Sequence, residues 1–255
     1  MIWILGDVHG FFYHVIEHVQ LAAKRGSPPD AIIFLGDLDC SQALHQVLSE
    51  IRDLTDIWFI HGNHDTDDKW RWNYLAKSEL ADKNLHGRVV EIAGLRVAGL
   101  GGVFRPKTIW APDKPDGVVH KNYDSFVRSL KKKPTQQDSE AVETAEEIRH
   151  KSSIFPDTVI TLARQRADIL LCHEAPSCHP YGWKAIDDLS RSMRVQRVFH
   201  GHHHDCRDYS ARNAQRGFEV YGVGFCGITA LSASDVVQVR PGDFDDVVEG
   251  SGGQG

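Results

Sequence analysis

The sequence lacks three features that would place it in a specialised class of protein. No apolar stretch approaches the roughly 20 residues that a membrane-spanning helix needs. Residues 1–7 carry no basic segment ahead of their short apolar run, so we expect no signal peptide. There is no basic excess either: 29 Lys and Arg stand against 35 Asp and Glu, a net charge of −6. Without the general attraction for phosphate backbones that nucleic-acid binders use, neither a membrane nor a nucleic acid is expected as a partner.

Cysteine is scarce, whereas histidine is abundant. The five cysteines are odd in number, and only Cys172 and Cys178 lie close together in the sequence. With no signal peptide expected, this pattern predicts reduced thiols and a cytoplasmic location. Histidine occurs 15 times, and four of these residues fall within 200–204. Such a cluster is typical of a metal site, because histidine is the commonest metal ligand, although a solvated histidine-rich loop would look the same.

The order of apolar and amphipathic segments predicts an α/β protein. Apolar runs at 2–5, 31–35 and 56–60 alternate with helical patterns at 12–23 and 44–51, which favours parallel strands joined by helices. A hairpin over 89–100 would make the sheet mixed. Further strands are predicted at 168–172, 195–200, 217–223, 225–231 and 235–240, with a helix at 185–193.

The chain length fits a single domain, which we place at residues 1–241. Residues 104–165 interrupt the alternation with prolines at 106, 112, 115 and 134 and a charged helical stretch at 139–150, and we interpret them as an insertion or lid. Residues 242–255 contain five glycines and four acids, so a disordered tail is predicted there.

Five of the predicted strands end in polar residues of the kinds that bind metals. Ligand sites in open α/β sheets lie beyond the carboxyl ends of the strands, so these residues are expected to converge. Residues two apart in extended backbone face the same way, which would let each such pair hold one metal from one side. The five clusters contain Asp7 and His9; Asp37 and Asp39; His61, Asn63, His64 and Asp65; His173; and His202, His203 and His204.

These clusters resemble the five motifs of the calcineurin-like metallophosphoesterase superfamily. They stand, in order, as Asp7-Val8-His9, Gly36-Asp37, Gly62-Asn63-His64-Asp65, His173 and Gly201-His202-His203-His204. Together they cover roughly residues 1–205. The resemblance implies a four-layer α/β sandwich in which two mixed β-sheets are flanked by helices, in agreement with the predicted strands and helices.

The resemblance also implies a role for each motif residue. Two divalent metal ions are expected, with Mn²⁺ favoured and iron or Zn²⁺ compatible with the same oxygen and imidazole ligands. His64 would protonate the leaving oxygen or stabilise developing charge. Asp65 would orient or charge His64, cap a helix at 66–76, or do both. Asp7, His9 and His204 would hold the first metal, Asn63, His173 and His202 the second, and Asp37 both.

The implied reaction is hydrolysis of a phosphate mono- or diester by a hydroxide that bridges the two metals. The substrate would be a phosphorylated small molecule or a phosphoprotein, with Arg105 and His179 as candidate binding residues and Trp110 as a ring that could stack on it. Asp39 is interpreted as a loop residue, with support of a metal ligand as the alternative, and His61, His200 and His203 as structural or supporting residues rather than ligands.

Three alternatives belong to the same fold: a catalytically silent scaffold, a nuclease and a protein phosphatase. Scaffold members usually lose the residue that stands here as His64. A nuclease is disfavoured by the net charge. The protein-phosphatase branch carries an arginine shortly after the second motif, whereas Leu38-Asp39-Cys40-Ser41 follows here. The sequence therefore resembles a more general bacterial-type member, of unknown oligomeric state.

Overall fold

The computed structural model describes residues 1–114, 116–130, 143–232 and 235–245. Its strands form two mixed five-stranded sheets, in the orders β10-β9-β1-β2-β3 and β4-β5-β6-β7-β8. The first sheet contains β1 (Ile2–Leu5), β2 (Ala31–Phe34), β3 (Asp56–Phe59), β9 (Ile228–Leu231) and β10 (Val236–Arg240). The second contains β4 (Val89–Ile92), β5 (Leu95–Leu100), β6 (Ile169–Cys172), β7 (Arg197–His200) and β8 (Glu219–Gly222). The three predicted closing strands are thus divided between the sheets.

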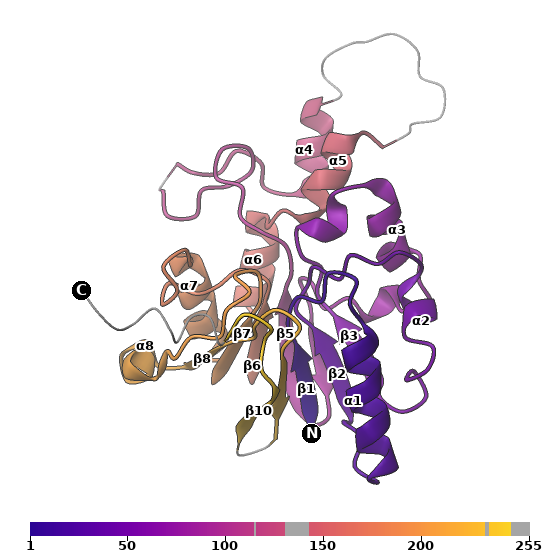
Figure 1. The fold of residues 1–255 in the computed structure, drawn as a ribbon. Helices are drawn as coiled ribbons and strands as arrows, with labels where there is room; N and C mark the ends of the chain where they lie inside the picture. Colours follow the sequence, from indigo (N-terminus) through magenta and orange to yellow (C-terminus); the bar gives the residue numbers. More distant parts are fainter. Residues whose placement is uncertain (115, 131–142, 233–234, 246–255) are drawn as a thin grey trace, which may run out of the picture.

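The sheets pack face to face, with helices outside both of them (Figure 1). Alternation along β1 shows why its whole run is apolar: Ile2 and Ile4 pack between the sheets, while Trp3 and Leu5 face the helices. The helices α1 (Tyr13–Lys24), α2 (Leu44–Val47) and α3 (Lys69–Ala76) cover the first sheet. The second sheet is covered by α6 (Pro156–Ala163) and α7 (Lys184–Met193). The predicted four-layer sandwich is therefore confirmed.

The predicted hairpin is present as β4 and β5, which pair antiparallel around Ala93 and Gly94, both with positive φ. In contrast, the helix expected at 66–76 begins later. A short 3₁₀ turn, η1 (His64–Thr66), comes first, and α3 starts at Lys69 because the Asp68 side chain accepts hydrogen bonds from Trp70 N and Arg71 N. The predicted Asp65 cap was therefore wrong.

Residues 104–165, the segment predicted as an insertion or lid, include a small cluster of buried rings and aliphatic side chains apart from the main core. The segment contains α4 (Tyr123–Leu130), α5 (Ala145–Arg149) and the turn η3 (His150–Ser152), and α4 and α5 stand beyond the sheets in Figure 1. Residues 139–142 of the expected charged helix lie outside the described residues. Because α6 packs in the same core as α7, it belongs to the outer helix layer rather than to the insertion. The remaining short elements are η2 (Ala81–Lys83), η4 (Ser210–Arg212) and α8 (Asn213–Arg216).

The start of the predicted disordered tail is ordered. The Asp245 carboxylate accepts hydrogen bonds from Cys206 N and Gly242 N, so residues 242–245 are tied to the domain. Residues 246–255 lie outside the described residues. All five cysteines are free thiols. Among the helices of the described ranges, none combines the length and apolar character that crossing a bilayer demands.

Candidate metal centre

Seven ligand-type side chains meet where β1, β2, β3, β6 and β7 end. Six of them form two overlapping groups whose ligand atoms lie within 4.8 Å of one another inside each group. Asp37 belongs to both groups. Asn63 joins the second, since its Oδ1 lies 3.1 Å from His173 Nε2. The first group is Asp7, His9, Asp37 and His204, and the second is Asp37, His173 and His202.

The distances place imidazole nitrogens and carboxylate oxygens face to face. In the first group, His204 Nε2 lies 3.1 Å from His9 Nε2 and 3.2 Å from Asp7 Oδ2. Asp37 Oδ2 lies 3.8 Å from His9 Nε2 of the first group and 3.4 Å from His173 Nε2 of the second. A single carboxylate oxygen is therefore shared by the two groups.

The two-residue spacing predicted that these side chains project from extended backbone. The structure shows turns instead. His9, Asp37, His202 and His204 have φ values of 42°, 48°, 69° and 60°, in the left-handed region. Each side chain is aimed by a tight turn at the end of its strand. Asp7 and His9 lie in one group as the spacing predicted, whereas His202 and His204 fall in different groups, so the prediction that each pair holds one metal was wrong for them. The extended-backbone reason given for the pairing was also wrong.

Two glycines let the turns approach one another. A Cβ on Gly62 would lie 2.2 Å from Asp37 Oδ1, and one on Gly201 would lie 2.3 Å from Asp7 Oδ1. Both positions therefore need a residue without a side chain. Close backbone packing at Gly62 and Gly201 brings the strand ends together around the two carboxylates.

Hydrogen bonds on the far side of two imidazoles orient them. The Nδ1–H of His9 faces Asp39 Oδ2 at 2.8 Å, and the Nδ1–H of His173 faces the Leu35 carbonyl at 2.8 Å. Each bond fixes a proton on Nδ1, so Nε2 is the nitrogen that points into the site and can bind a metal once it has lost its own proton. Arg71 Nη1 holds the other oxygen of Asp39. The interpretation of Asp39 as a plain loop residue was therefore wrong.

Asp65 lies elsewhere than the resemblance suggested. Its carboxylate is buried and accepts hydrogen bonds from Leu38 N, Asp39 N and Gly62 N, at 2.8, 3.0 and 2.8 Å. Asp65 therefore joins the loops after β2 and β3 instead of holding the His64 ring. That ring is held by Asp67, whose Oδ2 lies 2.7 Å from His64 Nδ1.

Burial and neighbouring charges set the protonation of the cluster. Burial by itself would lower the pKa of His173, but the Asp37 carboxylate outweighs it and raises this pKa to about 10. Burial would raise the pKa of Asp37, yet His173 and the His64 amide hold it well below its usual range. Burial and the charge of Asp37 raise the pKa of Asp65 to about 7. The field around Asp37 thus favours positive charge beside it.

The donor set fits divalent metal ions. Asp7 Oδ1 is buried without a hydrogen-bond partner, and His9 Nε2 and His204 Nε2 face each other. Imidazole nitrogens, carboxylate oxygens and the Asn63 amide oxygen suit Mn²⁺, iron or Zn²⁺. A cation would satisfy Asp7 Oδ1, which has no hydrogen-bond partner inside the described part of the protein.

The two candidate substrate residues are held within the protein. His179 is only 3% exposed, because its ring stacks on His203 at 3.8 Å and its Nε2 lies 3.5 Å from Asp205 Oδ2. A position at the substrate rim is therefore wrong for His179. The Arg105 guanidinium donates to Ser153 Oγ and Ser152 Oγ of the insertion. Trp110 packs on Phe104 inside the same segment.

The sequence reasoning missed two residues beside the site, Asp67 and Arg71. Asp67 follows His64 by three residues, a spacing that places side chains on one face of a helical turn, so the sequence did carry a signal for it. The partnership of Arg71 with Asp39 joins residues 32 apart. No local pattern could have indicated it.

Comparisons with known proteins agree with this geometry. A family model described as calcineurin-like phosphoesterase matches residues 1–206. An uncharacterized protein of Haemophilus influenzae is 35% identical over 241 residues, which cover 93% of this chain and 97% of that protein. The crystal structure of TT1561 of Thermus thermophilus is similar with a TM-score of 0.50 and 15% identity, over 93% of this chain and 98% of that one. A further solved structure has a TM-score of 0.54 at 11% identity, over 94% and 98% of the two chains.

Proposed function

Because the chain belongs to the calcineurin-like phosphoesterase family, we propose that it hydrolyses phosphate esters at a centre that holds two divalent metal ions. The observation that carries this proposal is the membership of Asp37 in both groups of ligand atoms. One carboxylate shared by two sites is what a two-metal hydrolase needs. We propose Mn²⁺ for both sites, with iron or Zn²⁺ as chemically compatible alternatives.

Each of the seven side chains has a place in this proposal. Bound here, two divalent ions would polarise the phosphoryl oxygens and make an attacking water more acidic. Asp39 and the Leu35 carbonyl keep His9 and His173 in the tautomer that offers Nε2. In this proposal one ion would be held by Asp7, His9 and His204, the other by Asn63, His173 and His202, and Asp37 would serve both.

His64 has the position of a group that acts on the ester. Its Nδ1–H donates to Asp67, so Nε2 is left for a substrate oxygen, and the side chain is exposed enough to be reached. Its backbone amide donates to Asp37 Oδ1, which fixes the residue against the proposed bridging ligand. We assign to His64 the protonation of the leaving oxygen or the stabilisation of charge that develops on it.

The same arrangement separates the enzyme from the alternative of a silent scaffold. A scaffold needs no convergence of seven ligand-type atoms and no histidine oriented beside them. Here both are retained, which supports catalysis. The proposed substrates are phosphate mono- or diesters of a small molecule or of a protein.

The test compares Asp37→Asn with Asp53→Asn, an exposed carboxylate near the start of β3. Rates on p-nitrophenyl phosphate and bis(p-nitrophenyl) phosphate are measured after reconstitution with Mn²⁺, and bound metal is counted by plasma mass spectrometry. We expect two metals per chain in the wild type and in Asp53→Asn. Asp37→Asn should lose metal and about 10³-fold in kcat/KM, since a metal clamp contributes several kcal/mol. Wild-type rate and metal content in Asp37→Asn would contradict the proposal.

A further inference from the structure

Three phenylalanine rings adjoin the proposed metal ligands on the side of His9 and His204. The Phe225 ring stacks on His9 with centroids 5.7 Å apart and an interplanar angle of 25°, and it lies 5.3 Å from the His204 ring. Phe244 stacks on Phe225 at 5.1 Å and 30°. Phe11 meets Phe225 edge-on at 6.3 Å. The rings form a continuous surface, which we call the phenylalanine platform.

The platform faces solvent, which is unusual for rings of this size. Phe11 is 54% exposed and Phe244 is 48% exposed, whereas the adjacent Phe12 is 6% exposed and packs in the core. The turn at His9 and Gly10, both with positive φ, leads directly into Phe11 and Phe12. Clustered exposed aromatic rings beside a polar site are typical of binding surfaces.

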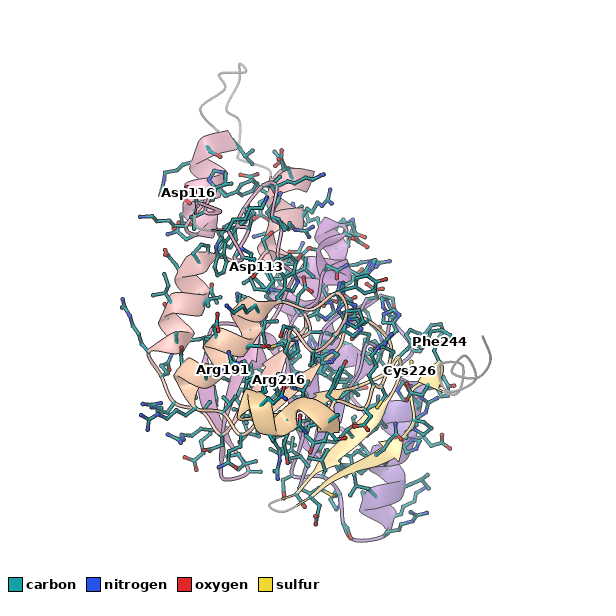
Figure 2. The ribbon with its side chains drawn as sticks, turned by 90° about the vertical axis from the view of Figure 1, so that its left-hand side faces the viewer. Asp113, Asp116, Arg191, Arg216, Cys226 and Phe244 are labelled. Atoms are coloured by element: carbon teal, nitrogen blue, oxygen red, sulfur yellow. The ribbon has the colours of Figure 1, made fainter. Side chains whose placement is uncertain are left out.

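The platform is assembled by specific contacts from a distant part of the chain. Asp243 N donates to the Phe225 carbonyl, and Arg240 Nη1 donates to the Cys226 carbonyl. A Cβ on Gly242 would lie 2.8 Å from Gly224 Cα, so the two segments touch through their backbones. Cys226 and Phe244 accordingly appear together at one edge of the molecule in Figure 2. These contacts hold Phe244 in place over Phe225.

We propose that the phenylalanine platform binds a flat aromatic ring in the alcohol part of the ester, and that the substrate class is therefore nucleotide-type phosphoesters. This inference rests on the proposed function. Phe225 touches two of the proposed metal ligands, so a phosphate at the metals and a ring on the platform fit within one small molecule. Phenylalanine offers no hydrogen bond, so the platform recognises the face of a base and not its edge.

The experiment compares adenosine 5′-monophosphate with ribose 5-phosphate, which has the same sugar and phosphate but no base. The ratio of the two kcat/KM values is measured for the Mn²⁺-loaded wild type, Phe11→Ala, Phe244→Ala and Phe225→Leu. Ile160→Ala is the matched control, because Ile160 is 49% exposed on α6, away from these rings. Circular dichroism reports on folding. Because Phe11 and Phe244 are exposed, their variants test the platform even if Phe225→Leu disturbs the fold.

We expect the wild type to prefer the nucleotide. Each platform variant should reduce this preference by about 5- to 100-fold, the usual effect of removing one aromatic ring from under a base, and Ile160→Ala should leave it unchanged. Saturation-transfer NMR with adenosine and metal-free protein should show ring contacts that are lost in Phe225→Leu.

The possible failures are distinct. Hydrolysis of neither compound, nor of p-nitrophenyl phosphate, would overturn the proposed function itself. Hydrolysis of both with equal kcat/KM, or a preference that survives all three substitutions, would overturn the platform alone. A preference for octyl phosphate over the nucleotide would also overturn it, because the surface would then serve an alkyl chain.

Discussion

At the scale of single residues, the proposed metal ligands are held in strained backbone. Four of the seven, His9, Asp37, His202 and His204, have positive φ, and so does Asp39. A non-glycine residue in the left-handed region costs on the order of 1–2 kcal/mol. Packing and hydrogen bonds offset this cost, for example the bond from His202 N to Asp7 Oδ2. The outcome is that these side chains are turned toward one another.

The proposed role of His64 leads to a prediction about leaving groups. We expect His64→Asn to lower kcat by about 10²–10⁴-fold on alkyl phosphates. The loss should be smaller on p-nitrophenyl phosphate, because a good leaving group barely needs a proton. Bound metal should stay at the wild-type level, since seven other residues hold it. Equal losses on both esters would leave charge stabilisation as the sole role, and a parallel loss of metal would contradict both roles.

The contact between Asp67 and His64 adds a second prediction. Asp67→Asn should keep His64 in place but weaken its orientation, so we expect a loss of about 10–100-fold in kcat, the range found for residues that orient active imidazoles. Combined with His64→Asn, the second substitution should add little, because both act through one ring. The control is Asp68→Asn, which alters the neighbouring carboxylate at the start of α3. Additive losses in the double variant would show that Asp67 acts independently of His64.

At the scale of elements, Asp65 fastens two of the loops that carry ligands. Its three hydrogen bonds come from backbone amides at the ends of β2 and β3, and the side chain is buried. The neighbouring Asp68 acts on one element only, by capping α3. Asp65 therefore stabilises the contact between two loops, whereas Asp68, three residues later, stabilises a single helix.

This difference predicts unequal costs of substitution. Asp65→Ala should lower the free energy of unfolding by about 3 kcal/mol, because it leaves three buried amides without an acceptor. Asp68→Ala should cost about 1 kcal/mol, the usual effect of losing an N-cap. Urea titration of metal-free protein measures both, and Asp82→Ala, at an exposed position in η2, is the control. Equal costs for Asp65→Ala and Asp68→Ala would mean that Asp65 does not fasten the loops.

At the scale of the whole molecule, three histidines outside the site link the stability of the fold to pH. His14 lies in α1, His86 ahead of β4 and His150 in η3, so they belong to three separate regions. Burial lowers the pKa of each to about 4, helped by Arg240 at His14 and by Arg105 at His150. The folded protein holds these rings neutral at pH values at which the unfolded chain would protonate them.

These shifts predict acid sensitivity. The stability that they contribute is fully present above the unfolded pKa of 6.5 and is lost as pH falls from there through about 4, because the unfolded state then binds more protons. Between pH 7.5 and 5.5 we expect a loss of about 1 kcal/mol per histidine. Urea midpoints in chelator measure it without metal, and His14→Gln should reduce the loss by one histidine's share. An undiminished loss in His14→Gln would contradict this explanation.

The sequence by itself determined the layers and the identity of the candidate ligands. Fully apolar runs such as Ile2–Leu5 can only lie in a sheet covered on both faces, and the polar residues directly after them must then lie at its carboxyl edge. The hairpin at Ala93 and Gly94 was equally local, since its turn depends on two adjacent residues. The strands and the hairpin turn could be predicted because each depends on residues that are neighbours in the sequence.

Only the tertiary structure decided how distant segments meet. Asp39 contacts His9, and Asp65 accepts hydrogen bonds from three backbone amides instead of contacting the His64 ring. Phe244, near the end of the chain, stacks on Phe225. None of these contacts produces a repeating pattern in the sequence. Some join residues at an arbitrary separation along the chain, and in others a turn changes the direction of the side chain. Burial of His179 and its stacking on His203 arose in the same way. Local pattern names the groups that can act, and long-range packing decides which of them touch.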